Sequence, residues 1–384
     1  MRRTALIVAA LLPFVALMGV TQAGATPAAT PCQPRFCALD RAVNALVSTP
    51  GGPPGMVVVV QKGSRTSTVT AGVADLTTSA PMSAGEEMRL ASVSKAYSGA
   101  AALALVSSGR LSLNDTIGKW LPTMPKIWAA ITLRQLLNHT SRIRDFSGED
   151  AFIDELLKSP QNPPPPADLL NSVKSLDLRP ADEPAYSYSN SDNILVALMV
   201  AAAAKVPYEE VLASRVFGPL GLTHTSLPRG STLAPPFVHG YQLDRPNPLE
   251  DVTSFFAAGW TWASGGIVAT PLDASKFIRG YAAGQLINKP TRNAQFQFIP
   301  GNSEPRGPGT NAVGLGLFRY STSCGTVYGH TGNTSGYTQF VAATRDGSRS
   351  VTVSVNLQIT PKSNSALFPE LRAIDELGVC AALR

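Results

Sequence analysis

Charged residues and cysteines are scarce in this chain. Only 15% of its 384 residues are charged, whereas 44% are apolar. Such a composition excludes charge-driven disorder and a long coiled coil, and the 32 glycines and 31 prolines form no collagen-like repeat. Four cysteines are too few for a disulfide-dense scaffold. The composition therefore predicts a large, loop-rich globular protein, and by itself it indicates no function.

Basic clusters and metal-binding motifs are also lacking. Lysines and arginines are scattered, with no run of the kind that follows a phosphate backbone, so nucleic acid is not an expected partner. The four histidines are widely separated and no His-Glu-x-x-His occurs, so we expect neither a metal nor a cofactor. The absence of Gly-x-Ser-x-Gly argues against a hydrolase with a nucleophile elbow.

Residues 1–25 have the layout of a secretory signal peptide. Two arginines precede an apolar stretch from Ala5 to Val20, and small residues follow at positions 23–25. The stretch is short for a membrane span, and the later sequence has no uninterrupted run of about 20 apolar residues. We therefore expect a secreted, extracellular protein with no membrane anchor. The alternative is that this segment is retained as an anchor helix.

The even number of cysteines fits two disulfides in an oxidising compartment. Cys32 and Cys37 flank a short loop, whereas Cys324 and Cys380 lie far downstream. Of the three possible pairings, we favour Cys32 with Cys37 and Cys324 with Cys380.

Strand patterns occur at both ends of the chain and helical patterns between them. We expect strands at residues 56–60, 66–73, 313–320, 327–331, 337–344 and 350–357. Helical spacing occurs at residues 39–47, 96–106, 133–138, 193–204, 208–216, 272–282 and 367–377.

These patterns predict an α/β (α+β) fold in residues 26–384, with one antiparallel β-sheet built from both chain ends and flanked by terminal helices. A mainly α-helical subdomain, about residues 91–284, is inserted into the sheet subdomain. That sheet subdomain comprises about residues 38–90 and 285–384.

The first candidate for chemistry is the segment from Ser92 to Lys95, where a strand-like stretch gives way to an alanine-rich helix. A spacing of three puts the Ser92 hydroxyl and the Lys95 ammonium on one helical face. A serine nucleophile needs a base, and a lysine can act as one if burial or nearby positive charge lowers its pKa. The alternative is a serine helix cap followed by a solvated lysine.

The second candidate is Tyr188-Ser189-Asn190, just before a helical stretch. A tyrosine close to a lysine can relay a proton, and an asparagine amide can orient a substrate carbonyl. Taken alone, the segment is equally a packed tyrosine followed by a helix cap.

The third candidate is His330-Thr331-Gly332-Asn333, at the end of a predicted strand. Gly332 would let a substrate backbone approach, and an edge strand here could pair with an extended acyl chain. His330 could supply positive charge or a hydrogen bond to a substrate carboxylate. Taken alone, the segment is equally a surface histidine in a glycine turn.

The order and spacing of these three motifs resemble the penicillin-recognising serine hydrolases. Within that group the chain is similar to the branch of Streptomyces-type D-alanyl-D-alanine carboxypeptidases, class C β-lactamases and related esterases. The resemblance covers most of the chain after residue 89. It implies an antiparallel sheet covered by terminal helices, with an inserted helical domain.

The resemblance also implies roles for individual residues. Ser92 would be the nucleophile that forms an acyl-enzyme, with Lys95 and Tyr188 jointly handling protons. The N–H groups of Ser92 and Asn333 would form the oxyanion hole. The residues implied to contact substrate are Asn190, Trp262, Arg319, His330, Thr331, Gly332 and Asn333.

Two positions depart from the family pattern. Arg142 follows His139-Thr140-Ser141, where relatives commonly have glycine. Phe318 follows Gly314-Leu315-Gly316-Leu317, where the carboxypeptidases have an arginine for the terminal carboxylate; Arg319 comes one residue later and would face the other side of a strand. The missing arginine weakens the hypothesis of a peptidase relative to that of an esterase.

We therefore expect a monomeric serine hydrolase that forms an acyl-enzyme and acts on a small-molecule or peptide substrate. A D-alanyl-D-alanine carboxypeptidase-like activity is the first hypothesis. An esterase or class C-like β-lactamase with the same Ser-Lys-Tyr groups is the alternative. A third hypothesis is a catalytically silent relative that binds peptidoglycan fragments.

Overall fold

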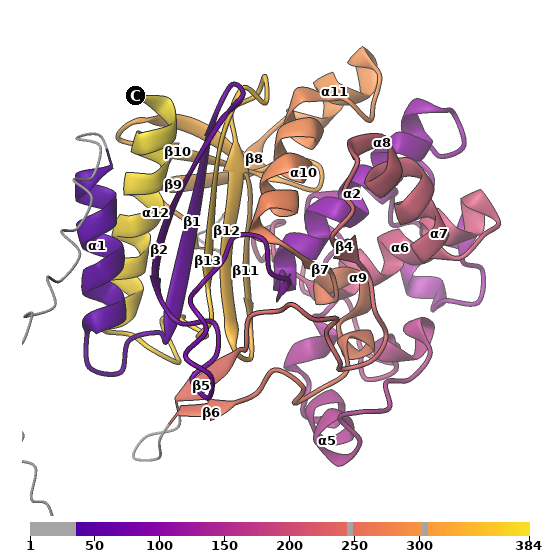
Figure 1. The fold of residues 1–384 in the computed structure, drawn as a ribbon. Helices are drawn as coiled ribbons and strands as arrows, with labels where there is room; N and C mark the ends of the chain where they lie inside the picture. The colour runs from indigo at the N-terminus through magenta and orange to yellow at the C-terminus, as the bar shows by residue number, and fades with distance from the viewer. Residues whose placement is uncertain (1–35, 244–248, 302–305) are drawn as a thin grey trace, which may run out of the picture.

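Both ends of the chain contribute to one antiparallel sheet of eight strands, in the order β2-β1-β13-β12-β11-β10-β9-β8 (Figure 1). The sheet strands are β1 (Gly55–Lys62), β2 (Arg65–Gly72), β8 (Ile299–Pro300), β9 (Thr310–Val313), β10 (Phe318–Thr322), β11 (Gly325–Thr334), β12 (Tyr337–Ala343) and β13 (Arg349–Val355). The expected sheet assembled from two distant segments is confirmed.

This computed structural model describes residues 36–243, 249–301 and 306–384. The predicted signal peptide at residues 1–25 lies outside the described residues, and so does Cys32 of the predicted Cys32–Cys37 bridge. None of the helices in the described ranges has the length and apolar character needed to cross a membrane.

Helices cover both faces of the sheet. On one face, α1 (Cys37–Ser48) and α12 (Leu367–Leu383) pack side by side, and on the other α10 (Pro271–Ala283) packs against β12 and β13 (Figure 1). Because both faces are covered, β1 is a nearly continuous apolar run, Met-Val-Val-Val-Val, with every residue buried from Gly55 to Gln61. The edge strand β2 instead alternates between polar and apolar positions, and most of its side chains are solvent-accessible.

The middle of the chain is mainly helical, as expected. Its helices are α2 (Ser94–Ser107), α3 (Ile117–Trp120), α4 (Leu133–Leu137), α5 (Asp150–Lys158), α6 (Asn190–Ala204), α7 (Tyr208–Leu212), α8 (Gly218–Leu220) and α9 (Trp262–Gly265), and α11 (Lys289–Gln295) follows α10. Two small sheets complete the fold: β3 (Met88–Arg89) with β7 (Val268–Ala269) and β4 (Thr225–Ser226), and β5 (Tyr241–Leu243) with β6 (Leu249–Asp251).

One expected strand, residues 313–320, is wrong. The segment Gly314–Leu317 is a turn that separates β9 from β10, and the two strands pair with each other. At Gly316 the backbone has φ +69, and a Cβ there would lie 2.7 Å from the Cα of Gly99 in α2. Leu315 and Leu317 are buried in the apolar core of the helical part rather than within a strand, and their apolar pattern therefore resembles that of a strand.

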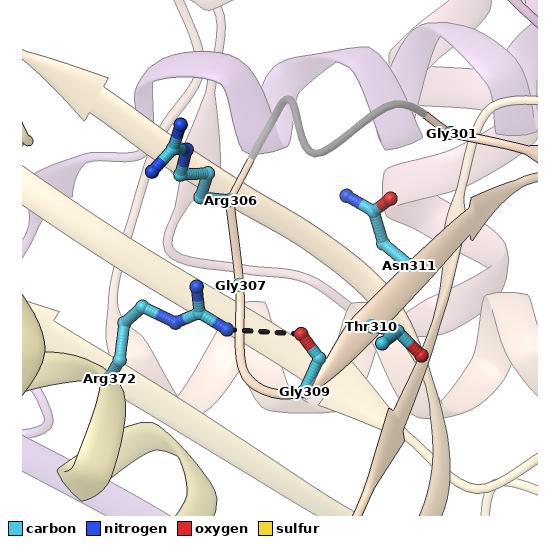
Figure 2. A pocket seen from close by; sticks show the side chains of 7 residues that line it. All are labelled: Gly301, Arg306, Gly307, Gly309, Thr310, Asn311 and Arg372. Atoms are coloured by element: carbon cyan, nitrogen blue, oxygen red, sulfur yellow. Dashed lines mark hydrogen bonds between the residues drawn. The ribbon is translucent and has the colours of Figure 1, made fainter.

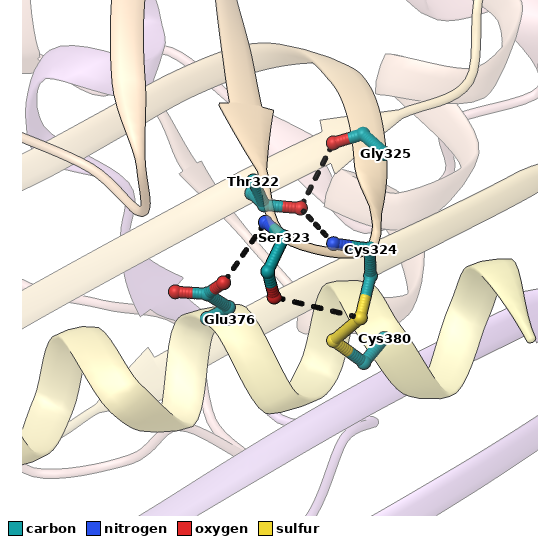
Figure 3. Close-up of a disulfide and its surroundings, with 6 residues drawn as sticks. All are labelled: Thr322, Ser323, Cys324, Gly325, Glu376 and Cys380. Atoms are coloured by element: carbon teal, nitrogen blue, oxygen red, sulfur yellow. Dashed lines mark hydrogen bonds between the residues drawn. A yellow bond between two sulfur atoms is a disulfide. The ribbon is translucent and has the colours of Figure 1, made fainter.

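A disulfide ties the sheet to the C-terminal helix. Cys324, in the turn between β10 and β11, is bonded to Cys380 on α12 (Figure 3). Beside it, the backbone N–H of Ser323 donates to Glu376 Oε1 at 3.0 Å. The predicted Cys324–Cys380 pairing is confirmed.

Replacing both bridge cysteines, Cys324→Ser with Cys380→Ser, is expected to lower the free energy of unfolding. The bridge closes a chain segment with a sequence separation of 56 residues. A loop of that size corresponds to about 4 kcal/mol of unfolded-state entropy. Denaturant titration of the double variant and of the oxidised parent measures the difference; equal midpoints and slopes would contradict a stabilising role.

Candidate active site

Ser92 lies in a 3-10 turn, Ala91–Val93, that runs directly into α2. Neighbouring strands hold this turn in place: Leu90 N–H donates to Ile267 O at 2.9 Å, and Gln339 Nε2 on β12 donates to Arg89 O at 3.1 Å. Ala91 has a left-handed backbone, φ 49, which is uncommon for a residue with a side chain. The hydroxyl-bearing residue is thus fixed between the sheet and the helical part.

Lys95, one turn further, is buried beneath Ser92. Its side chain is 1% exposed. Its Nζ lies 3.0 Å from Ser92 Oγ and donates to Asn190 Oδ1 at 2.6 Å and to Ser264 O at 2.7 Å. Burial lowers the pKa of Lys95 to about 7, while Asp145 and Asp192 act in the opposite direction. Because two of the three partners can only accept hydrogen bonds, the remaining direction on Nζ is the one for proton exchange with Ser92.

Asn190, the first residue of α6, connects Lys95 to a turn that precedes α5. Its Oδ1 accepts from Lys95, and its Nδ2 donates to Asp145 Oδ2 at 3.0 Å and to Ser147 Oγ at 2.8 Å. The amide is therefore fully engaged within the protein. These contacts let Asn190 orient Lys95, and Asn190 also lines the cavity beside Ser92, where the resemblance implies a contact with the substrate amide.

Tyr188 packs against Lys95, whose Nζ lies 4.9 Å from the centre of the phenol ring. Its Oη is buried and makes no hydrogen bond within the described residues. Burial raises the pKa of Tyr188 well above its ordinary value, and the Ser92 hydroxyl offsets this only in part. At neutral pH the side chain is therefore a phenol and not a phenolate.

The third predicted motif forms one wall of the same cavity. Thr331, Gly332 and Asn333, on β11, line a cavity of about 270 Å³ together with Ser92 and Tyr188. The pairing of β10 with β11 ends at Phe318 opposite Gly329, so residues 330–334 extend past β10. The strand is not an outer strand of the sheet, but this stretch has the local edge that pairing with an extended chain requires.

His330 differs from the expectation. The ring is 1% exposed. Its Nδ1 lies 2.6 Å from the carbonyl oxygen of Thr331, which can only accept, so the proton sits on Nδ1. Its Nε2 then carries no proton, and this nitrogen is buried without a hydrogen bond in the described residues. Because burial lowers the pKa of His330 to about 3, the ring is neutral and cannot give a substrate carboxylate either positive charge or a proton from Nε2.

Two predicted contact residues lie away from the cavity. Trp262 is buried in the helical part, where its Nε1 donates to Glu209 Oε1 at 2.8 Å. Arg319 is exposed and its guanidinium stacks 5.2 Å from the ring centre of Phe298. Phe318, by contrast, is buried and contacts His330 edge-on, with ring centres 5.1 Å apart. The one-residue shift therefore does move the arginine to the other face.

Sequence reasoning missed a second wall of the cavity. It consists of Arg306 from the segment before β9, Thr360 and Pro361 from the segment before α12, and Phe368 in the first turn of α12. Arg306 also borders a neighbouring pocket of about 410 Å³, where Arg372 on α12 donates to Gly309 O at 3.0 Å (Figure 2). No pattern in the sequence marks these residues, because only the fold brings them to Ser92. In the part of the chain that the structure describes, no cluster of three His, Cys, Asp or Glu side chains is placed to hold a metal.

The fold and the buried serine-lysine pair are those of a serine hydrolase. Residues 39–376 match the family model described as Beta-lactamase, and the chain belongs to this family.

Curated relatives carry penicillin-binding names. Penicillin-binding protein 4* of Bacillus subtilis (strain 168) is 24% identical over 280 residues, which are 69% of this chain and 60% of the relative. The putative penicillin-binding protein PbpX of the same organism is 25% identical over 219 residues, 56% of this chain and 51% of the relative. The chain thus spans between about half and three-fifths of these proteins.

Two solved structures match over nearly their whole length. A D-stereospecific amidohydrolase from Streptomyces sp. is 27% identical with a TM-score of 0.75, covering 87% of this chain and 97% of that chain. The D-amino acid amidase of Ochrobactrum anthropi SV3, complexed with L-phenylalanine amide, has a TM-score of 0.79 at 22% identity, covering 90% and 98%. The second likeness shows the fold alone.

Gly332→Ala is expected to impair both stability and any chemistry at Ser92. A Cβ at this position would lie 2.3 Å from Leu90 O and 3.2 Å from the Cβ of Ala91, so β11 and the Ser92 turn must separate. Overpacking of this kind costs about 1–3 kcal/mol. Thermal melting and reaction with an activated ester measure the two effects. Gly230→Ala is the matched control, since nothing lies within 4 Å of its added methyl; equal behaviour of the two variants would contradict the close approach.

Proposed function

We propose that this protein is an exported serine hydrolase that cleaves amide bonds at D-amino-acid residues through an acyl-enzyme on Ser92. D-alanyl-D-alanine-type peptides are the first candidate substrates. The observation that carries the proposal is the 3.0 Å contact of Ser92 Oγ with a buried lysine whose pKa is about 7. Penicillin-binding relatives and a D-stereospecific amidohydrolase of the same fold support the substrate class.

In the acylation step, neutral Lys95 takes the hydroxyl proton as Ser92 Oγ bonds to the substrate carbonyl carbon. Lys95 suits this task because a base is most effective when its pKa lies near the working pH. Asn190 and the Ser264 carbonyl hold the other two directions on Nζ, so the lone pair of the neutral amine points at Ser92. The carbonyl oxygen becomes an oxyanion, and we assign its stabilisation to the N–H groups of Ser92 and Asn333.

Expulsion of the leaving amine then needs a proton. Tyr188 is a phenol at neutral pH, so it can donate to the amine nitrogen and be reprotonated from the Lys95 ammonium. The amine departs as the C–N bond breaks, which leaves the acyl group on Ser92. Water then attacks the ester, Lys95 and Tyr188 carry its proton, and Ser92 regains its hydroxyl. The sequence assigned proton transfer to Lys95 and Tyr188 jointly. In this mechanism Lys95 is the base and Tyr188 is the proton relay.

A second candidate is hydrolysis of D-amino acid amides or esters, or of β-lactams. Phe318 favours it, because it occupies the place of the carboxylate-binding arginine of carboxypeptidases with a buried ring. Arg306 argues against this second candidate. It is the charged side chain among the described residues that line the cavity with Ser92, and it could bind a substrate carboxylate. The choice between the two candidates therefore depends on whether Arg306 receives the substrate carboxylate.

Export remains part of the proposal. It is supported by the layout of residues 1–25 and by the Cys324–Cys380 disulfide, since such bridges persist in oxidising compartments. N-terminal sequencing of protein recovered from the culture medium tests it, and a medium form that begins at Met1 contradicts cleavage.

Incubation with benzylpenicillin is expected to add the mass of one penicilloyl group, and Ser92→Ala is expected to abolish the adduct. Intact-mass spectrometry with peptide mapping measures both. Ser214→Ala, an exposed serine on the helical part, is the matched control and should be labelled normally. The absence of any adduct, from penicillin and from activated esters alike, would overturn the proposed function.

The same reaction should depend on pH in the direction set by Lys95. Because burial lowers its pKa to about 7, the neutral base accumulates as the pH rises through that value. The acylation rate constant should increase about tenfold from pH 6 to pH 8 and then level off. A flat profile across this range would exclude Lys95 as the base.

Arg306→Gln should separate the two substrate classes. Loss of a charge-assisted hydrogen bond to a carboxylate corresponds to at least about a tenfold loss in kcat/KM. We expect that loss for a peptide ending in D-alanine with a free carboxylate, and little change for the same peptide as its C-terminal amide. Arg319→Gln is the control, because Arg319 lies outside the cavity. Equal effects of Arg306→Gln on both peptides would favour the amidase or esterase.

A further inference from the structure

His139 occupies a backbone position that glycine usually fills. It follows α4 and its Asn138 cap with a left-handed backbone, φ 56, a conformation that is unfavourable for a residue with a side chain. Its side chain is nevertheless buried, with 3% exposed. A strained, buried polar residue persists only where its surroundings hold it, and such outliers cluster at functional sites.

A buried acid fixes the imidazole. Asp192 on α6 is completely buried, and its Oδ2 lies 3.0 Å from His139 Nδ1. Ser141 Oγ donates to the other oxygen, Oδ1, at 2.5 Å and accepts from Ile143 N–H at 3.0 Å. Burial raises the pKa of Asp192 well above its ordinary value. Both oxygens of the carboxyl group are engaged, and His139 cannot rotate without leaving one of them unpaired in the interior.

The His139–Asp192 pair holds the segment around Tyr188. The carbonyl oxygen of His139 accepts from Ser187 N–H at 2.9 Å. Its Nδ1, which is paired with Asp192, also lies 3.4 Å from the backbone nitrogen of Ser189. Between these contacts the imidazole packs on the phenol, with ring centres 4.7 Å apart and planes tilted by 44°. His139 thus touches both flanking residues of Tyr188 and its ring.

Tyr188 depends on this packing for its position. Its Oη makes no hydrogen bond of standard geometry within the described residues, and the polar group that acts on it is the nearby Ser92 hydroxyl. Packing of the ring therefore contributes much of its orientation. Burial lowers the pKa of His139 to about 3, so the ring is neutral at working pH and acts by shape and hydrogen bonding rather than by charge.

We infer that His139, held by Asp192, is a positioning residue that keeps the Tyr188 phenol against Lys95 for proton transfer. The inference rests on the proposed function, in which Tyr188 relays the proton to the leaving group. It assigns His139 no contact with substrate and no proton of its own.

A double-mutant cycle tests it. His139→Asn keeps a residue that tolerates the left-handed backbone and can still donate to Asp192, but it removes the ring from Tyr188. We expect it to reduce the penicillin acylation rate constant about tenfold when Tyr188 is present, and less than twofold in a Tyr188→Phe background, because residues that act through one another are not additive. A merely structural role would give the same factor in both backgrounds.

Asp192→Asn is the second variant, which keeps the shape of the acid and should show the same non-additivity. His239→Asn is the matched control, since His239 also pairs with an acid, Asp251 at 2.6 Å, but on the surface, and it should leave the rate unchanged. Equal losses in both Tyr188 backgrounds, or no loss from His139→Asn, overturn this inference while the Ser92 adduct stands. Absence of the adduct in the parent protein overturns the proposed function, and this inference with it.

Discussion

The site depends on the burial of one ammonium group. Lys95 can serve as a base only because it is removed from water, and the protein must then satisfy its donors from three separate elements: Ser92 before α2, Asn190 at the start of α6 and the Ser264 carbonyl in α9. Those contacts fix how the helices meet. Asp145 and Asp192 limit how far the pKa of Lys95 falls, so that it is about 7. At neutral pH the side chain is therefore present in both its protonated and its neutral form.

Much of the fold and of the candidate site could be predicted from local sequence. The serine-lysine spacing is set by one helical turn, and strand patterns at both chain ends predicted the sheet that frames the site. The Ser264 carbonyl could not be foreseen, because every residue carries the same carbonyl group. Arg306 and the His139–Asp192 pair could not be foreseen either, since each joins segments whose proximity only tertiary packing creates. The strand expected across residues 313–320 failed for the same reason: burial against a helix and burial in a sheet leave similar apolar runs.

The neighbourhood of Ser92 holds polar groups that the fold does not satisfy. The phenol of Tyr188 and Nε2 of His330 are both buried without hydrogen bonds in the described residues. Buried groups of this kind cost stability unless a partner arrives, and a ligand or ordered water is the usual partner at a functional site. A ligand bound beside Ser92 could supply partners to these two groups.

The stretch of β11 beyond β10 sets a length scale for whatever binds there. Residues 330–334 offer only a few backbone donors and acceptors, and Thr331, Gly332 and Asn333 lie in the cavity wall. A long exposed strand edge is a template for pairing with other chains and promotes aggregation, whereas a very short edge limits such pairing. The length of this overhang therefore limits the number of backbone hydrogen bonds that any extended chain could form along residues 330–334.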